Sequence, residues 1–371
     1  MSAVTQYASA APAEEQRGSG SPRRVLGGQL PSLTGMRWAA ALLVFLYHVG
    51  RLQYFGHGQH FVVWAFGPGA AGVSFFFILS GFVLAWTARP GDRPTAFWRR
   101  RLARIYPVHL VTAMLALVLG LTLVPLLRPT GLAEVAANLF LVSSWKLAWW
   151  QALNPVSWSL TCEAFFYALF PFMYLVLRRV GPRVLVSVMA VCAAVVIVLP
   201  WLYLQHVHTW SLSSFPAVRL PEFVLGVAAG RLVQLGRWRG PGIEASLALT
   251  LIGYFLVGQL VEDYQLAAGT VIGLSLLVPA AAVADLNGLP SMWRHPRLVR
   301  LGEWSFAFYM IHILVMRVGE RLFEVHPRLD VPQALGATTA AFLISLGLAW
   351  ALYELVEKPA RRRLLRGSRR G

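Results

Sequence analysis

Ionisable side chains lie inside apolar stretches of this sequence, where they are costly and are therefore candidates for function. The stretch from Pro31 to Gly50 is apolar enough to be a membrane helix, yet it carries Arg37 near its start and His48 near its end. At about 100° and 1.5 Å per residue, the two side chains share one helix face and are separated by roughly 16 Å. This arrangement favours a functional site. The alternatives are a positive-inside anchor for Arg37 and a hydrogen-bonded interior histidine for His48.

A second basic group lies in the segment WRRRLARIYP, residues 98–107, where another apolar stretch begins. Arg101 and Arg104 are i, i+3 neighbours and would share one helix face. Guanidinium groups placed in this way suit a phosphate, because they can bind its oxygens in bidentate fashion. Contact with lipid headgroups is the alternative.

A carboxylate lies about two turns into the apolar stretch that begins in the segment NPVSWSLTCEAFFY, residues 154–167. An unpartnered Glu163 would be strongly unfavourable at this depth, so it needs a partner. His48, at a similar depth from the outer end, is the natural one. A carboxylate beside an imidazole fixes its tautomer and raises its basicity. Four residues near the outer surface could bind polar groups of a substrate: Asn154, Ser157, Trp158 and Ser159.

Other polar and small residues have structural alternatives. His312 could line the same cavity, or it could make a hydrogen bond in helix packing. Arg219 and Glu222 can pair locally at i, i+3. A run of small residues indicates close helix packing and also leaves room for a thin substrate arm; it comprises Gly69, Gly72, Ser80 and Gly81.

No metal site is expected. Cys162 and Cys192 both lie in apolar stretches and have no metal-ligand spacing. Two histidine pairs lack a nearby third ligand and are interpreted as loop residues: His57 with His60, and His206 with His208.

Composition indicates a membrane protein. Of 371 residues, 57% are hydrophobic and the mean hydropathy is +0.58. The net charge of +17 could suggest nucleic acid. However, the arginines lie in short loops between apolar runs, which is the positive-inside pattern. We therefore predict an all-α, polytopic membrane bundle and no nucleic-acid partner.

About ten apolar runs are long enough to span a bilayer. They lie at about 34–51, 70–87, 105–126, 156–177, 184–204, 218–234, 244–261, 266–285, 302–319 and 333–355. The shorter, Trp-rich segment 131–150 is predicted to be an interfacial or half-membrane helix. Ten spans place both termini in the cytoplasm, and the loop arginines fit this orientation in a plasma membrane. Residues 1–28 are predicted to be a disordered tail, 31–360 the membrane domain and 361–371 a basic tail.

These residues together resemble the membrane acyltransferase 3 family. The matching features run from residue 31 to 360: Arg37-x10-His48, Ser80-Gly81-Phe82, Arg101-x2-Arg104-Ile105-x-Pro107, Trp158-Ser159-Leu160-x2-Glu163, Glu222-Phe223-x2-Gly226, Leu301-Gly302 to His312, and Glu357-Lys358-Pro359. One departure is His109, where a tyrosine is common. Some members carry a secreted hydrolase-like domain after the membrane part, and none is expected here.

The resemblance implies a ten-helix enzyme that moves an acyl group, usually acetyl, from cytoplasmic acyl-CoA to a hydroxyl. It implies that His48 is the general base, that Glu163 supports catalysis, and that Arg37, Arg101 and Arg104 contact CoA. We add Ser80 to this donor site. The expected acceptor is a saccharide or a glycosylated natural product.

Acyl transfer also makes sense of the spacing. Arginines at the inner surface could hold the CoA phosphates while the thin pantetheine arm reaches toward His48. Direct transfer is preferred, and a covalent acyl-histidine relay stays open. The rings of Phe75, Phe76 and Phe77 would favour a small acyl group if they face the tunnel. The alternative function is a transporter or flippase of a lipid-linked sugar that uses His48 and Glu163 as a proton relay.

Overall fold

The computed structural model describes residues 30–88, 91–205, 210–258, 260, 264, 267–323 and 326–366. Within these ranges the chain is helical, and its only β-type pairing is an isolated bridge between Phe55 and Leu329. The predicted disordered tail, residues 1–28, lies outside the described residues, as do residues 367–371 of the predicted basic tail.

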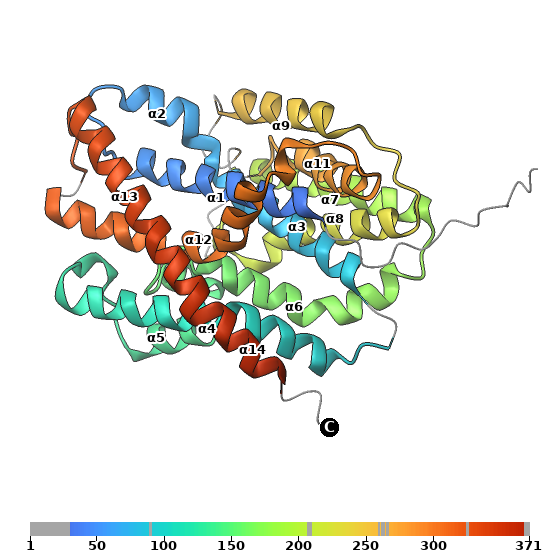
Figure 1. The fold of residues 1–371 in the computed structure, drawn as a ribbon, viewed down its shortest axis with the longest axis horizontal. Helices are drawn as coiled ribbons and strands as arrows, with labels where there is room; N and C mark the ends of the chain where they lie inside the picture. The colour runs from blue at the N-terminus through green and yellow to red at the C-terminus, as the bar shows by residue number, and fades with distance from the viewer. Residues whose placement is uncertain are drawn as a thin grey trace, which may run out of the picture.

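In the described part of the chain, ten helices follow the ten predicted spans in order (Figure 1). They are α1 (Pro31–Arg51), α3 (Ala71–Thr87), α4 (Pro94–Thr122), α6 (Trp158–Leu177), α7 (Pro182–Leu204), α8 (Pro216–Gln234), α9 (Ile243–Val257), α11 (Val271–Leu286), α12 (Pro296–Phe323) and α13 (Val331–Leu352). Seven helical runs are long and apolar enough to cross a membrane, and α9 and α11 are apolar but shorter. The predicted all-α membrane bundle is confirmed.

The segment 131–150 is not one helix. It forms the short α5 (Leu132–Leu139) and two single turns, η3 (Ser143–Trp145) and η4 (Leu147–Trp149). Leu141, at a positive φ of 58°, interrupts the helical path after α5. The segment is too broken to be an eleventh span, as predicted, and the expected interfacial or half-membrane helix is limited to the eight residues of α5.

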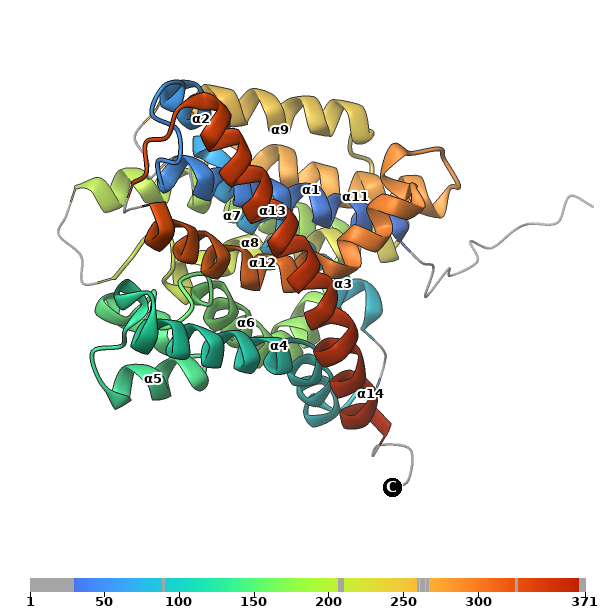
Figure 2. The same ribbon diagram turned by 60° about the vertical axis from the view of Figure 1, so that its left-hand side comes forward.

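Small residues allow α3 to lie directly against α8, and the two helices run side by side (Figures 1 and 2). A Cβ atom at Gly81 would overlap the carbonyl oxygen of Phe223, and one at Gly226 would overlap that of Ile78. At Gly72, a Cβ would lie 2.6 Å from the carbonyl oxygen of Ala40 on α1. The predicted role of these small residues in close helix packing is therefore confirmed.

The carboxyl-terminal helices cross the bundle obliquely (Figure 2). α13 continues through a π-helical turn, Tyr353–Glu357, into α14 (Lys358–Arg366), which packs against α4. The predicted basic tail, 361–371, therefore begins inside a helix. The turn also carries Glu357, which is only 6% exposed, to the part of α4 that holds Arg104.

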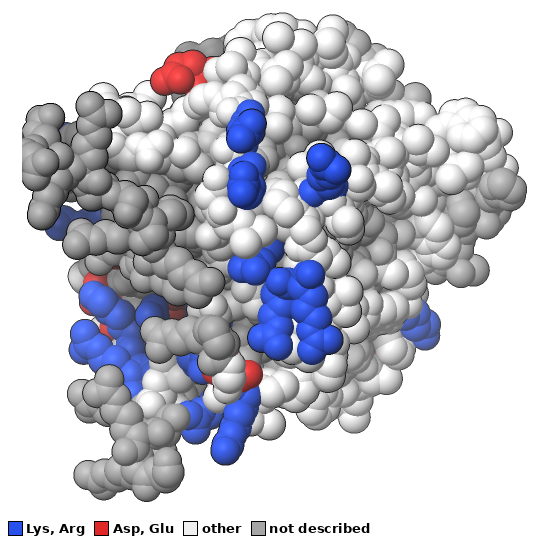
Figure 3. All heavy atoms as spheres, turned by 90° about the vertical axis from the view of Figure 1, so that its right-hand side faces the viewer, with Lys and Arg blue, Asp and Glu red and all other residues white. Residues whose placement is uncertain are grey.

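One end of the bundle is strongly basic. Figure 3 views the molecule from the right-hand side of Figure 1, where Lys and Arg side chains gather and Asp and Glu are sparse. The exposed cations in the connections and in the first turns of helices include Arg183, Arg237, Arg239, Arg294, Arg297 and Arg300.

Candidate functional site

A cavity of about 300 Å³ lies between α1, α3, α4, α6 and α12. Its lining includes all four predicted donor-site residues, and it draws on helices that are far apart in the sequence. The polar side chains that line it are Thr34, Arg37, Ser80, Thr87, Arg101, Arg104, Ser159, Glu163, Tyr167 and Tyr309. The bundle therefore brings together the predicted arginines, Ser80 and Glu163 in one place.

The apolar wall of the cavity comes mainly from α3. Phe76 and Phe77 line it, so two rings of the predicted aromatic run face the cavity. Phe75 is not part of this lining and packs in a buried cluster that includes Leu225 and Val271. Successive helix residues point about 100° apart, so three adjacent rings cannot all share one face.

The cavity carries unbalanced positive charge. Among the described residues, no carboxylate lies within ion-pair distance of Arg37, Arg101 or Arg104. Arg100, one residue before Arg101, instead pairs with Asp92 outside the cavity. Three guanidinium groups without ion-pair partners in a partly buried space are suited to a polyanionic ligand.

Glu163 lies among these arginines. Its Oε2 atom accepts a hydrogen bond of 2.9 Å from the Tyr167 hydroxyl, which lies 3.4 Å from the Ser80 hydroxyl. The carboxylate also interacts electrostatically with Arg104 and Arg37. Sequence reasoning missed Tyr167, although its position one helical turn after Glu163 places both on one face.

The predicted pairing of His48 with Glu163 is wrong. His48 does not line the cavity, and its Nδ1 atom lies 2.9 Å from the Val44 carbonyl oxygen and 3.2 Å from Nε2 of His312. The position of a residue along its helix determines its level in the bundle, but it does not determine which neighbouring helix the side chain faces. The two residues therefore share a bundle without sharing a contact.

His312 is the polar partner that His48 has in place of Glu163. The imidazole of His312 is fully buried, and its ring stacks on Phe308 at an interplanar angle of 11°. Its Nδ1 atom lies 2.8 Å from the carbonyl oxygen of Tyr309 and 3.2 Å from that of Phe308. Of the two alternatives for His312, the structure shows the hydrogen bond in helix packing, between α12 and α1, and not a place in the cavity lining.

Tyr309 connects the cavity to His312, which in turn contacts His48. Its side chain lines the cavity, and its ring contacts that of His312 with centroids 5.9 Å apart. Its hydroxyl donates toward the Ser159 hydroxyl at 3.0 Å and the Val156 carbonyl at 3.1 Å. Sequence reasoning also missed this residue, which lies on the face of α12 that carries His312.

The predicted substrate-binding group at the start of α6 is divided. Asn154 is fully buried, and its amide donates to the Met310 carbonyl oxygen at 2.8 Å. Ser157 donates to the Asn154 carbonyl and accepts from Asn138, so both side chains bond within the protein. Trp158 packs edge-to-face against Phe77. Ser159 is the member of this group that lines the cavity.

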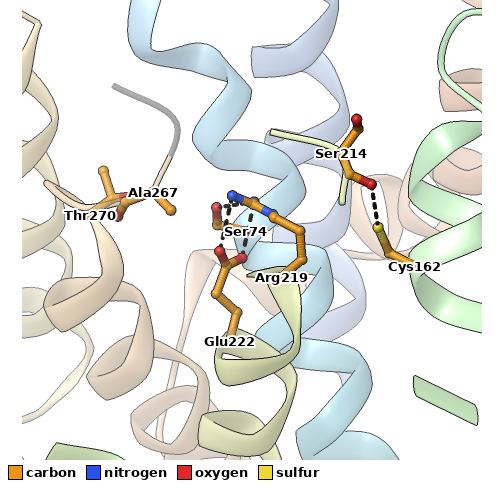
Figure 4. Close-up of polar contacts among 7 residues, drawn as sticks. All are labelled: Ser74, Cys162, Ser214, Arg219, Glu222, Ala267 and Thr270. Carbon is orange, nitrogen blue, oxygen red and sulfur yellow. Dashed lines mark hydrogen bonds and ion pairs between the residues drawn. The ribbon is translucent and has the colours of Figure 1, made fainter. Parts of the chain in front are cut away.

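Arg219 and Glu222 form the predicted local ion pair (Figure 4). The guanidinium also donates to the Ser74 hydroxyl at 3.0 Å and lies over the Phe77 ring. All three polar side chains are buried and bond to one another, so this cluster links α8 to α3.

No group of three metal-ligating side chains occurs in the parts of the chain that the structure describes. His57 and His60 lie on the surface, whereas His206 and His208 fall outside those parts.

Comparison with known proteins identifies a clear set of relatives. The profile of a family described as "Acyltransferase domain" matches residues 30–354. The chain is 39% identical over 369 residues to Acyltransferase MdmB of Streptomyces mycarofaciens, covering 92% of this chain and 94% of that protein. It is 29% identical to the exopolysaccharide production protein ExoZ of Rhizobium meliloti, covering 82% and 92% respectively. A shorter match, 28% identical over 45% of this chain, is to 28% of the O-acetyltransferase OatA of Staphylococcus aureus. No solved structure matches.

Proposed function

The chain belongs to the acyltransferase-domain family, and from this premise we propose that it transfers an acyl group, specifically acetyl, from cytoplasmic acyl-CoA to a hydroxyl of a saccharide or glycosylated natural product. The observation that carries the proposal is the cavity with three arginines that lack ion-pair partners. CoA has a polyanionic headgroup and a thin neutral arm. The arginines of the cavity suit the headgroup, and its apolar wall suits the arm.

The donor site consists of Arg37, Arg101 and Arg104 around the phosphates, with Ser80 beside them. The guanidinium groups come from two helices, α1 and α4, so a bound phosphate group would bridge them. Phe76 and Phe77 face the same cavity. Their bulk favours a short acyl chain, and the printed name of OatA, an O-acetyltransferase, supports acetyl.

The basic end of the bundle is proposed to face the cytoplasm, because cytoplasmic segments of membrane proteins carry an excess of Lys and Arg. Ten spans, an even number, would bring both ends of the chain to this side. Both termini are then cytoplasmic and the protein is a multi-pass protein of the plasma membrane. The donor cavity receives acyl-CoA from the compartment in which acyl-CoA is made.

His48 is the proposed general base. Its imidazole takes the proton of the acceptor hydroxyl as the oxygen attacks the thioester carbonyl; the carbon–sulfur bond then breaks and the thiolate of CoA takes the proton. This step requires the thioester to pass Tyr309, which lines the cavity and contacts His312. Glu163, held by Tyr167, helps to order the arginines rather than the imidazole.

The acceptor class is supported by the relatives. The printed name of ExoZ refers to exopolysaccharide production, which fits a saccharide acceptor. MdmB, which this chain matches along nearly its whole length, is a Streptomyces acyltransferase.

The test uses the purified full-length protein in lipid nanodiscs. It is incubated with radiolabelled acetyl-CoA and a metabolite extract from a strain that lacks the gene. We expect label to move to a compound in the extract. A flippase would instead move a lipid-linked sugar across vesicles without acyl-CoA, and that result would replace this proposal.

A further inference from the structure

We propose that His312 is a positioning residue that fixes the tautomer of His48, so that the proton is held on Nδ1 and Nε2 is the basic atom. This inference deepens the proposed function, because it takes His48 as the base. In this inference His312 takes the role of orienting the imidazole. Glu163, which was expected to do so, has no contact with His48 in the structure.

His312 has a defined tautomer. Its Nδ1 atom faces two carbonyl oxygens, of Tyr309 at 2.8 Å and of Phe308 at 3.2 Å. Carbonyl oxygens only accept hydrogen bonds, so Nδ1 must carry the hydrogen. A neutral imidazole has one N–H, which leaves Nε2 of His312 as an acceptor.

His48 has a defined tautomer as a consequence. Its Nδ1 atom faces two groups that can only accept: the Val44 carbonyl oxygen at 2.9 Å and Nε2 of His312 at 3.2 Å. The hydrogen of neutral His48 therefore lies on Nδ1. Among the described residues, Nε2 of His48 has no polar contact, so its lone pair is available to a substrate hydroxyl.

The surroundings make His312 a fixed acceptor. It is fully buried, stacked on Phe308, and next to Phe45, with ring centroids 6.2 Å apart. His48 is only partly buried, so substrate can approach it. When His48 accepts a proton at Nε2, the neutral His312 can still receive the hydrogen bond from Nδ1, which stabilises the imidazolium.

Other charged groups act on His48 from further away. Arg317 on α12 and Arg51 at the end of α1 interact with it electrostatically, and both are cations. Neither can accept a hydrogen bond from Nδ1, so neither can set the tautomer. Within the described residues, the Val44 carbonyl is the remaining candidate, and it already accepts a bond within α1.

The experiment reads the tautomer directly. Full-length protein in nanodiscs is labelled with isotopic histidine, and long-range nitrogen–proton NMR spectra distinguish the two tautomers. His48→Gln identifies the His48 signals by their loss. We expect the Nδ1–H pattern in the unmutated protein, a shift toward the Nε2–H pattern in His312→Ala, and recovery of the Nδ1–H pattern in His312→Gln, whose side-chain oxygen can accept at the position of Nε2.

Kinetics supply the second readout. His312→Ala should lower kcat about tenfold or more while leaving the KM for acetyl-CoA unchanged, and His312→Gln should restore most of kcat. The matched control is His109→Ala, which also removes a buried histidine but one that bonds to the Asn138 carbonyl away from the site. It should reproduce any loss of stability without changing the His48 signals.

An Nε2–H pattern for His48 in the unmutated protein would overturn the proposal. So would an unchanged Nδ1–H pattern in His312→Ala, because the Val44 carbonyl would then suffice. These spectra need no acceptor. A protein that fails to transfer acetyl groups but shows the expected tautomers would contradict the proposed function and not this inference.

Discussion

At the scale of single residues, the chemistry of the cavity depends on which cations have partners. Arg100 and Arg101 are adjacent in the sequence, yet Arg100 pairs with Asp92 while Arg101 faces the cavity without a carboxylate within ion-pair distance. This difference allows the contribution of a cavity charge to acetyl-CoA binding to be separated from the contribution of a surface charge.

Arg101→Ala should weaken acetyl-CoA binding by about 10- to 100-fold, since hydrogen bonds to charged groups contribute about 1.5–3 kcal/mol. Arg100→Ala removes the same charge from the same helix outside the cavity and should change the Kd by less than about threefold. Binding is measured by titration calorimetry on nanodiscs. Equal effects of the two substitutions would show that only the overall charge matters.

The aromatic wall should set the length of the acyl group. Phe76→Ala opens space beside the arginines and should raise the rate with butyryl-CoA relative to acetyl-CoA by about tenfold or more, the usual discrimination for one or two methylenes. Phe75→Ala removes an equal ring that does not line the cavity, and the ratio should stay unchanged. The ratio of kcat/KM for butyryl-CoA to that for acetyl-CoA is measured for both variants. A larger change of this ratio in Phe75→Ala would contradict the placement of Phe76 in the cavity wall.

At the scale of helices, the bundle depends on close contact between α3 and α8. Gly81 and Gly226 allow this contact, since a Cβ on either would meet backbone atoms of the facing helix. Backbone atoms cannot move aside as a flexible side chain can, so the helices themselves would have to separate.

Gly81→Ala should therefore destabilise the protein by about 1–3 kcal/mol, the usual cost of overpacking. Gly347→Ala on α13 is the matched control, because nothing lies within 4 Å of the added Cβ. It should be neutral or stabilising by up to about 1 kcal/mol, as alanine is the better helix former. Thermal unfolding in detergent measures both, and equal midpoints would refute the packing argument.

The helices were largely predictable from the sequence, because apolar length and loop arginines are local signals. The convergence of Arg37 with Arg101 and Arg104 was also predicted, from their positions near the starts of their helices. The partner of His48 was not. Periodicity shows which residues of one helix share a face, but the choice between Glu163 and His312 depends on how α6 and α12 are rotated about α1.

At the scale of the whole molecule, the account requires that the basic end of the bundle face the cytoplasm. The cavity arginines lie in the part of α1 and α4 near that end, so the orientation decides which compartment supplies the donor. Positive-inside charge is the physical reason for proposing this orientation.

A green fluorescent protein fused after Gly371 should be fluorescent, and an alkaline phosphatase fused at the same position should be inactive. The same two reporters, each placed instead at Asp330 between α12 and α13, should give the opposite pattern, with no fluorescence and an active phosphatase. Both are measured in intact bacteria. Phosphatase activity from the carboxyl terminus would place the donor cavity on the wrong side for cytoplasmic acyl-CoA.

The central claim is that a donor held by cavity arginines reacts at an imidazole outside that cavity. A substitution of that imidazole should therefore change the rate of acetyl transfer and not the affinity for acetyl-CoA. We would measure acetyl-CoA affinity and acetyl transfer to the extract of the gene-deleted strain for the unmutated protein and for His48→Gln. The account predicts an unchanged Kd with a rate reduced by about 10²- to 10⁴-fold, the contribution typical of a general base. Full transfer by His48→Gln would contradict it.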